Sequence, residues 1–211
     1  MASSTGATLA GRPTGYTVAK RAFDIAVVLL ILPLVLPIML LCAVIARIDS
    51  PGPIIFWQMR TGQHGKRFRL YKFRTMVRDA EERKASLAHL NVLPFPDFKI
   101  PDDPRITTVG RVLRATSLDE LPQLWNVLRG EMSLVGPRPT SFAASTYDLW
   151  HTRRLEVRPG VTGLWQIEGR NSSTFDERLR LDLAYVDTAS LWVDVKILVA
   201  TVGAVLRRSG Q

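Results

Sequence analysis

The stretch IAVVLLILPLVLPIMLLCAVIA, residues 25–46, decides the fold, because its 22 residues carry no charge. At a helical rise of about 1.5 Å per residue, it is long enough to cross the hydrocarbon core of a bilayer. Pro33 and Pro37 lie near its middle and remove backbone donors that a straight helix would use. The stretch therefore predicts a membrane helix that bends or breaks at its prolines.

Basic residues flank this apolar stretch on both sides. Lys20 and Arg21 precede it, Arg47 follows it, and residues 50–78 contain seven more basic residues and no acidic one. Because lysine and arginine accumulate on the cytoplasmic side of membranes, both ends are predicted to be cytoplasmic. A re-entrant helix hairpin that returns to the face it entered satisfies this pattern. A single proline-kinked span with the first twenty residues outside fits the residues equally well at this point.

The overall composition indicates anionic partners. The formal net charge is +9 in 211 residues, which suits a surface that attracts the phosphates of nucleotides, nucleic acid or lipid. The single cysteine, Cys42, and three widely spaced histidines predict neither an internal disulfide nor a structural metal site. Residues 1–15 are small, polar and rich in glycine, and are predicted to form a disordered tail.

The remainder alternates short strands, helices and loops. Two strands at 54–58 and 67–73, joined by the loop RTGQHGK, predict a basic β-hairpin, and residues 79–90 predict a short polar helix. Prolines make 93–104 an irregular loop or a lid. Two helical pieces are expected within 107–130, a tight turn at 131–139, a helix at 147–157 and a glycine-punctuated loop with at most a short strand at 158–172. An amphipathic helix at 175–187 and an apolar helix at 191–208 complete the chain.

Asp119 and Glu120 stand side by side in the sequence SLDELP. Ser117 followed by Glu120 matches a capping box at the start of a helix, although Pro122 complicates the helical register. A functional interpretation starts from the basic neighbours at 111, 114, 129 and 138, which would keep a carboxylate ionised as a nucleophile or a magnesium ligand. The combination indicates phosphoryl chemistry at a membrane.

Further basic side chains are placed to meet a phosphate. Proline on both sides of Arg138 makes GPRP a rigid turn, and rigidity would hold its guanidinium ready. Lys72 and Arg74 alternate in YKFRTM and share one face of a strand, which is either solvated or turned toward a phosphate. Trp165 is interpreted as a packing residue.

Four segments together resemble a known family. KRAFDIAVVLL, GKRFRLYKFRTM, DPRITTVGRVLRATSLDELPQLWNVLRGEMSLVGPRP and VRPGVTGLWQIEGRN, in this order, are similar to the bacterial sugar transferases, the monotopic polyprenyl-phosphate phosphoglycosyl transferases. The similarity runs from about residue 20 to about residue 208 and is greatest to the short, exopolysaccharide-type members. It implies an α+β, mostly helical fold: a re-entrant membrane helix hairpin at 16–48, then a cytoplasmic membrane-associated catalytic domain at 49–211 with a small β-hairpin and amphipathic interfacial helices.

The resemblance also implies an activity and a set of site residues. Family members transfer a sugar 1-phosphate, here expected to be a hexose 1-phosphate, from a UDP-sugar to undecaprenyl phosphate. UMP is released and glycan assembly begins at the cytoplasmic face of the inner membrane. Asp119 is expected to carry a covalent phosphosugar, and Glu120, with Asp119, to bind Mg²⁺. The substrate-binding residues it implies are Lys72, Arg74, Arg114, Arg138, Arg158, Arg170 and Asn171.

Partners and departures follow from the same resemblance. Membrane lipid is an expected partner, nucleic acid is not, and a homodimer is allowed. Leu36-Pro37 with an additional Pro33 replaces the Ser-Pro that many members have at the helix break, so the geometry of the bend is not carried over. Two other interpretations of the residues are a non-catalytic basic bitopic membrane protein and a nucleic-acid-binding protein, neither of which would need Asp119.

Overall fold

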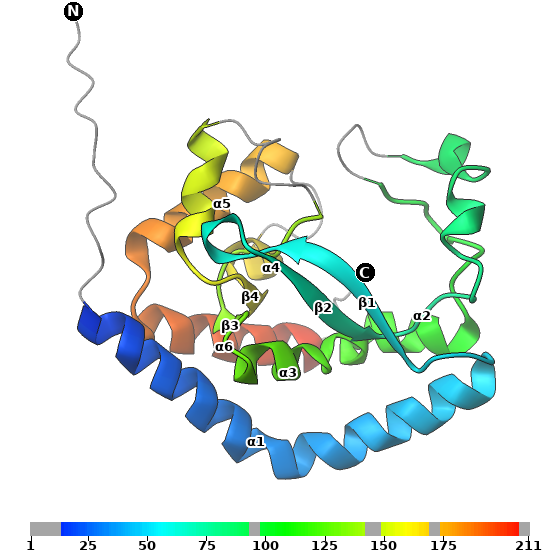
Figure 1. The fold of residues 1–211 in the computed structure, drawn as a ribbon, viewed down its shortest axis with the longest axis horizontal. Coiled ribbons are helices and arrows are strands. Elements are labelled where there is room, and N and C mark those ends of the chain that lie inside the picture. The colour runs from blue at the N-terminus through cyan, green and yellow to red at the C-terminus, as the bar shows by residue number, and fades with distance from the viewer. Residues whose placement is uncertain (1–13, 93–97, 142–148, 169–173, 207–211) are drawn as a thin grey trace, which may run out of the picture.

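A computed structural model describes residues 14–92, 98–141, 149–168 and 174–206. Its longest element is helix α1 (Thr14–Asp49), which is the one helix in these ranges that is long and apolar enough to cross a membrane. The helix continues through Pro33 and Pro37, and Figure 1 shows it bent near its middle, where the prolines fall in the sequence. The predicted break is therefore a bend, and the helix begins inside the segment expected to be a tail.

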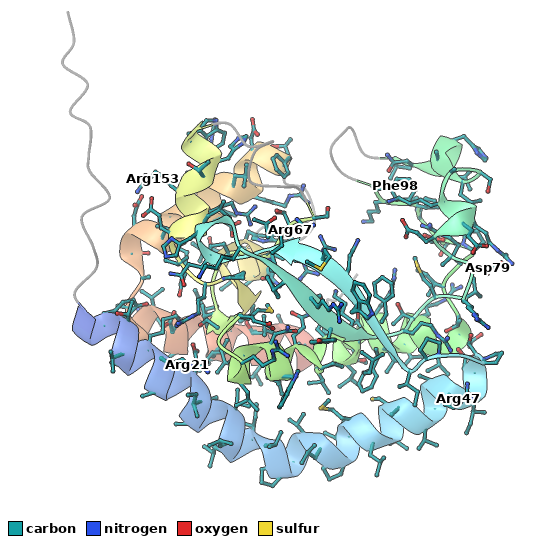
Figure 2. The ribbon with its side chains drawn as sticks, viewed as in Figure 1. Arg21, Arg47, Arg67, Asp79, Phe98 and Arg153 are labelled. Carbon is teal, nitrogen blue, oxygen red and sulfur yellow. The ribbon has the colours of Figure 1, made fainter. Side chains whose placement is uncertain are left out.

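Polar contacts join both halves of α1 to the rest of the protein. In the first half, the Lys20 ammonium lies 2.8 Å from the buried Asp194 carboxylate. Arg21 donates to two backbone carbonyls at the end of helix α3 (Gln123–Leu128). In the last turn, the Asp49 carboxylate accepts a hydrogen bond from the Val109 N–H at 3.3 Å, 60 residues along the chain. Figure 2 shows Arg21 and Arg47 at the two sides of the bend. The two arms of α1 thus contact the same globular body.

Residues after α1 form the predicted basic hairpin. Strands β1 (Ile55–Thr61) and β2 (Arg67–Phe73) pair antiparallel, with Phe56 opposite Lys72 and Gln58 opposite Leu70. Buried Phe68 and Leu70 turn one side of β2 toward the main core, whereas buried Phe73 lies on the other side and packs in a second cluster. The structure thus confirms the strands that the alternating sequence predicted.

The predicted polar helix at 79–90 is wrong. The structure has only two 3₁₀ turns there, Glu82–Lys84 and Ala88–Leu90, and neither contains a buried residue. A short helix gains most of its stability by packing an apolar face, but of this segment only Ala80 is buried, and Leu90 is exposed. The part of the predicted irregular loop that the structure describes, residues 98–104, contains no helix or strand.

The centre of the molecule contains helices α2 (Thr108–Ala115) and α3 (Gln123–Leu128), both predicted. Two three-residue strands that the sequence did not separate from its turns follow, β3 (Ser133–Val135) and β4 (Gly160–Thr162), which pair in parallel. Gly136 and Gly160 permit this pairing, because a Cβ on Gly160 would lie 2.1 Å from the Gly136 nitrogen. The pairing brings the GPRP and RPG motifs side by side.

The remaining helices close the body. The residues expected to form a helix at 147–157 contain a 3₁₀ helix (Leu149–Glu156), and α4 (Leu164–Glu168) occupies part of the predicted glycine-punctuated loop. Helices α5 (Phe175–Thr188) and α6 (Leu191–Leu206) match their predictions, and a capping box of Thr174 and Glu177 starts α5. Val28 of α1 packs in the main core with residues of β2, α3, β3, α5 and α6. A second core joins Cys42 and Ala46 of α1 to Phe73 and Leu113.

Candidate active site

The acidic pair Asp119 and Glu120 lies in a 3₁₀ turn, Leu118–Glu120, between α2 and α3. Ser117 adopts a left-handed conformation with φ of 58°, which reverses the chain after α2. Its side chain makes no capping hydrogen bond, so the capping-box interpretation of Ser117 and Glu120 is wrong. The pair is instead presented by a tight turn, and Pro122 is the N-cap residue of α3.

Two cations hold the Glu120 carboxylate. Its Oε1 accepts hydrogen bonds from Lys72 Nζ at 2.8 Å and from Arg138 NH2 at 2.7 Å. Asp119 is different, because no hydrogen bond from the described residues reaches its carboxylate, and Lys72 Nζ lies 4.0 Å from its Oδ2. Two hydrogen bonds therefore fix the Glu120 carboxylate in place, whereas the Asp119 carboxylate has no such restraint from the described residues.

The surroundings shift the pKa values of the two carboxyl groups in opposite directions. Burial, together with the negative charge of Glu120, raises the pKa of Asp119 above its ordinary value, although Lys72 acts in the other direction. Burial alone would raise the pKa of Glu120 as well. The ion pairs with Arg138 and Lys72 outweigh burial there and hold the pKa of Glu120 well below its usual range. Adjacent carboxylates thus have distinct electrostatic environments.

A cavity of about 710 Å³ opens beside the pair. Its lining includes both carboxylates and four of the basic residues proposed from the sequence, Lys72, Arg74, Arg114 and Arg138. The Arg114 side chain is oriented by a hydrogen bond from its Nε to Thr75 Oγ1 at 2.8 Å. The hairpin, the dyad turn and the GPRP turn, far apart in the sequence, therefore contribute to one basic cavity that can receive a phosphorylated ligand.

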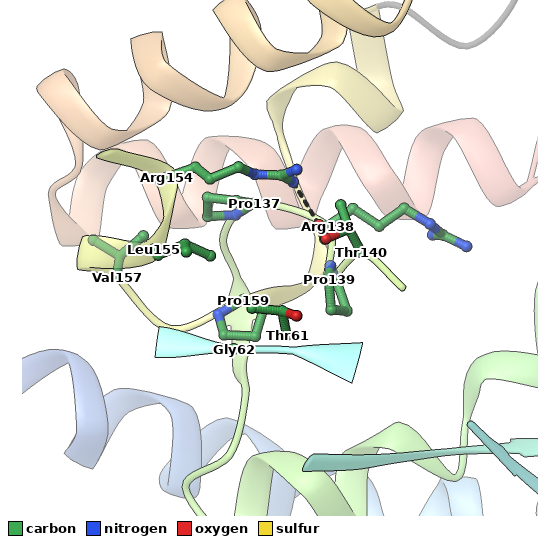
Figure 3. A pocket seen from close by; sticks show the side chains of 10 residues that line it. All are labelled: Thr61, Gly62, Pro137, Arg138, Pro139, Thr140, Arg154, Leu155, Val157 and Pro159. Carbon is green, nitrogen blue, oxygen red and sulfur yellow. Dashed lines mark hydrogen bonds between the residues drawn. The ribbon is translucent and has the colours of Figure 1, made fainter. Parts of the chain in front are cut away.

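Buried residues brace the turn that carries Arg138. The Arg154 guanidinium donates to the Arg138 carbonyl at 2.5 Å (Figure 3). Both residues line a cavity of about 10 Å³, which has room for a single water at most. Arg154 also donates to Asp182 on α5, and both side chains are at most 5% exposed. This chain of contacts fixes the backbone from which the Arg138 side chain reaches Glu120.

Among the described residues, the remaining predicted substrate-binding residue, Arg158, does not line this cavity. Arg158 is half-buried, is absent from the lining, and lies close enough to Arg21 of α1 for their charges to interact. The RPG motif thus serves the pairing of β4 with β3. Arg170 and Asn171 lie outside the described residues.

Sequence reasoning missed several residues of the site. Trp165, interpreted as a packing residue, and Gln166 line the cavity from α4, and Arg60 lines it from β1. The alternation of the hairpin could have identified Arg60, which lies two residues from Gln58 and four from Phe56 on the cavity face of β1. No sequence pattern could have identified Arg154 and Asp182. They are 28 residues apart, and only in the structure are they seen to be buried and paired.

Comparison with known proteins gives a consistent result. A family model described as "Bacterial sugar transferase" matches residues 15–208. The chain is 46% identical over 196 residues to an undecaprenyl-phosphate galactose phosphotransferase of Salmonella typhimurium, covering 90% of this chain and 41% of that protein. It is 45% identical over 203 residues to galactosyl transferase CpsE of Streptococcus agalactiae, covering 92% and 44%.

A third relative is similar in length. The exopolysaccharide production protein ExoY of Rhizobium meliloti is 40% identical over 205 residues, covering 95% of this chain and 90% of that protein. The chain therefore spans less than half of the two galactose transferases and most of ExoY.

Proposed function

The chain belongs to the bacterial sugar transferase family, and from that premise we propose that it transfers a hexose 1-phosphate from a UDP-hexose to undecaprenyl phosphate and releases UMP. The observation that carries the proposal is the contrast between the two carboxylates. Glu120 accepts hydrogen bonds from two cations, whereas Asp119 is buried, receives no hydrogen bond from the described residues and lines a basic cavity. Two relatives have galactose transfer in their names, so UDP-galactose is the first donor to test. The name of ExoY suggests exopolysaccharide assembly as the process served.

The reaction has two steps in this proposal. An Asp119 carboxylate oxygen attacks the phosphorus that bears the sugar, the new O–P bond forms, and the bond to the UMP phosphate breaks. In the second step, a phosphate oxygen of undecaprenyl phosphate attacks the same phosphorus and displaces the Asp119 carboxylate. The products are UMP and an undecaprenyl diphosphate hexose. Lys72, Arg114 and Arg138 would stabilise negative charge on the phosphates, and Glu120 would keep Lys72 and Arg138 in position.

Magnesium fits the carboxylates of the site only together with substrate. No group of three or more potential ligands among His, Cys, Asp and Glu occurs in the part of the chain that the structure describes. Mg²⁺ commonly uses one or two carboxylates plus substrate phosphates, and Asp119 and Glu120 can supply that number. When bound, the ion would neutralise charge on the diphosphate. Asp119 and Glu120 are the residues that would hold it.

We expect the purified protein to release UMP from UDP-galactose in a Mg²⁺-dependent manner and, with undecaprenyl phosphate, to form a lipid-linked sugar. Chelation with EDTA should abolish both products, and Glu120→Gln should raise the Mg²⁺ concentration needed for half-maximal release. Chromatography of UMP and of radiolabelled lipid across a panel of UDP-sugars provides the measurement. If no UDP-sugar in the panel yields UMP, the proposal is wrong.

The proposal also places α1 in the membrane as a re-entrant element. Its large apolar side chains, among them Leu30 at 80% and Ile48 at 79% exposed, would otherwise face water. Both arms of the bent helix contact one body, as a helix that enters and leaves on the same face would require. Helices α2, α3 and α6 lie alongside α1 and also expose large apolar residues, Val112, Trp125 and Trp192. These would lie at the interface.

A labelling experiment tests this topology. After Cys42→Ser, single cysteines at the exposed positions Pro51 and Thr17 should both react with a membrane-impermeant maleimide only when the cytoplasmic face is accessible. A single span through the bilayer would instead make the two positions react from opposite faces. A cysteine at exposed Glu82 serves as the reference for the cytoplasmic face. Labelling in intact cells and in inverted vesicles, followed by gel shift, distinguishes the two arrangements.

A further inference from the structure

Three arginines converge where α1 ends, outside the group that surrounds Glu120. Arg47 NH1 donates to the Gly52 carbonyl at 3.0 Å, and Arg74 NH2 donates to the Ser50 carbonyl at 2.5 Å. Arg74 NH1 is buried without a hydrogen-bond partner. Burial and the nearby positive charges of Arg47 and Arg78 lower the pKa of Arg74. We call Arg47, Arg74 and Arg78 the arginine cluster.

Two members of the arginine cluster, Arg47 and Arg74, contact the main chain at Gly52. Its φ of +128° lies in a region that other residues rarely adopt, and a Cβ there would lie 2.2 Å from Arg74 NH1. The Arg74 guanidinium therefore packs directly on the main chain that also binds Arg47. Turn geometry thus brings the like charges together and keeps them there.

No carboxylate of the described residues forms an ion pair with the arginine cluster. Within the described ranges, none of its guanidinium groups has a carboxylate partner within 4.0 Å. The acidic residues close to it in sequence are engaged elsewhere: Asp49 accepts from the Val109 N–H, Asp79 pairs with Arg83, and Glu81 pairs with Lys84. Three neighbouring positive charges repel each other, and a bound anion would offset that repulsion.

Position indicates what kind of anion reaches the arginine cluster. Arg74 and Arg78 line the cavity that contains Asp119 and Glu120. On the other side, the last turns of α1 before Arg47 expose Val44 and Ile45, and Ile48 is 79% exposed. An anion held here is therefore next to an apolar surface and next to the reactive carboxylate, which suits the headgroup of an amphiphile better than a soluble nucleotide.

We propose that the arginine cluster binds the phosphate of the lipid acceptor, separately from Lys72, Arg114 and Arg138, which serve the phosphates of the sugar donor. This assignment rests on the proposed function and specifies which phosphate each set of cations receives. Guanidinium groups suit a phosphomonoester because they can donate several charge-assisted hydrogen bonds to it. The two sets would hold the acceptor phosphate and the phosphosugar on Asp119 at one cavity, as the second step requires.

Kinetics of the two half-reactions test the assignment. The variants are Arg78→Gln and Arg47→Gln in the full chain, with Arg180→Gln as the matched control, since Arg180 is an exposed arginine of α5 that does not line the cavity. We expect each cluster variant to raise the KM for undecaprenyl phosphate about tenfold, the loss of one charge-assisted interaction. UMP released without acceptor should change by less than about twofold, well below the tenfold that one such interaction contributes. The control should match the parent in both, and circular dichroism should show all variants folded.

Three results would overturn the proposal. UMP release by the parent protein tests the proposed function separately. An unchanged acceptor KM in both variants would exclude the arginine cluster from acceptor binding. A loss of UMP release equal to the loss of turnover would assign it to the donor phosphates. A KM effect seen in vesicles with phosphatidylglycerol, but not in phosphatidylcholine alone, would identify a phospholipid headgroup as its ligand. Absence of UMP release from the parent protein would contradict the proposed function itself, independently of these variants.

Discussion

Replacing Asp119 by asparagine should reduce UMP release in the absence of acceptor by at least about 10³-fold, the scale expected when a covalent nucleophile is removed. Asparagine keeps the size of the side chain but has no carboxylate oxygen with which to attack phosphorus. Glu120 cannot substitute, because Lys72 and Arg138 hold its carboxylate in place. The measurement is single-turnover UMP formation with UDP-galactose and Mg²⁺.

This result would not arise from unfolding. Asp119 is 8% exposed, and burial raises its pKa, so a neutral isostere removes a charge that the surroundings disfavour. The matched control is Asp102→Asn. Asp102 is almost fully exposed, contacts Arg111 only at 3.8 Å, and has a φ of 49° that asparagine tolerates well. Undiminished UMP release in Asp119→Asn, with the control equally active, would remove Asp119 from the role of nucleophile.

Local patterns predicted those parts of the fold in which one element produces its own signal. The hairpin was predictable because alternation in RFRLYKF matches the buried face of β2, and α5 because its apolar positions recur with a helical period. Strands β3 and β4 have three residues each, too few for any period, and they exist because Gly136 and Gly160 allow their backbones to approach. The helix prediction for residues 79–90 was wrong, because a helix-forming composition does not stabilise a short helix that packs no apolar face.

The candidate site divides in the same way. Asp119, Glu120, Lys72 and Arg138 could be proposed from unusual local sequence, and the structure brings them together. The sequence could not show that Glu120 is hydrogen-bonded and Asp119 is not. This difference arises because Lys72 of the hairpin and Arg138 of the GPRP turn both reach Glu120. The support behind Arg138 was equally hidden, because it joins a 3₁₀ helix to α5 across the molecule.

The second large effect is expected from breaking the buried ion pair between Arg154 and Asp182, which supports the Arg138 turn. Arg154→Met should lower the free energy of unfolding by about 3–5 kcal/mol, the usual cost of leaving one partner of a buried ion pair uncompensated. Here the abandoned partner is Asp182, which is 2% exposed, and Asp182→Leu should cost a similar amount by stranding Arg154. Urea unfolding of the detergent-purified protein, followed by tryptophan fluorescence, measures both.

The neighbouring pair offers a matched control on the same two elements. Arg153 and Asp187 also join the 3₁₀ helix to α5, but about half of each side chain is exposed to solvent. Arg153→Met or Asp187→Leu should therefore change the free energy of unfolding by only about 0–1 kcal/mol. Equal losses for the exposed and the buried pair would show that burial is not what makes the Arg154–Asp182 interaction matter.

The double variant Arg154→Met/Asp182→Leu separates stability from catalysis. Because apolar side chains of similar volume can replace a buried ion pair at little cost, most of the free energy of unfolding should return in the double variant. UMP release should not return with it, since the Arg138 carbonyl still lacks the Arg154 hydrogen bond that fixes its turn. An increase in KM for the UDP-sugar that persists in the stable double variant would show that Arg154 positions Arg138. Full recovery of UMP release would mean that the Pro137 and Pro139 rings alone are sufficient to hold the turn.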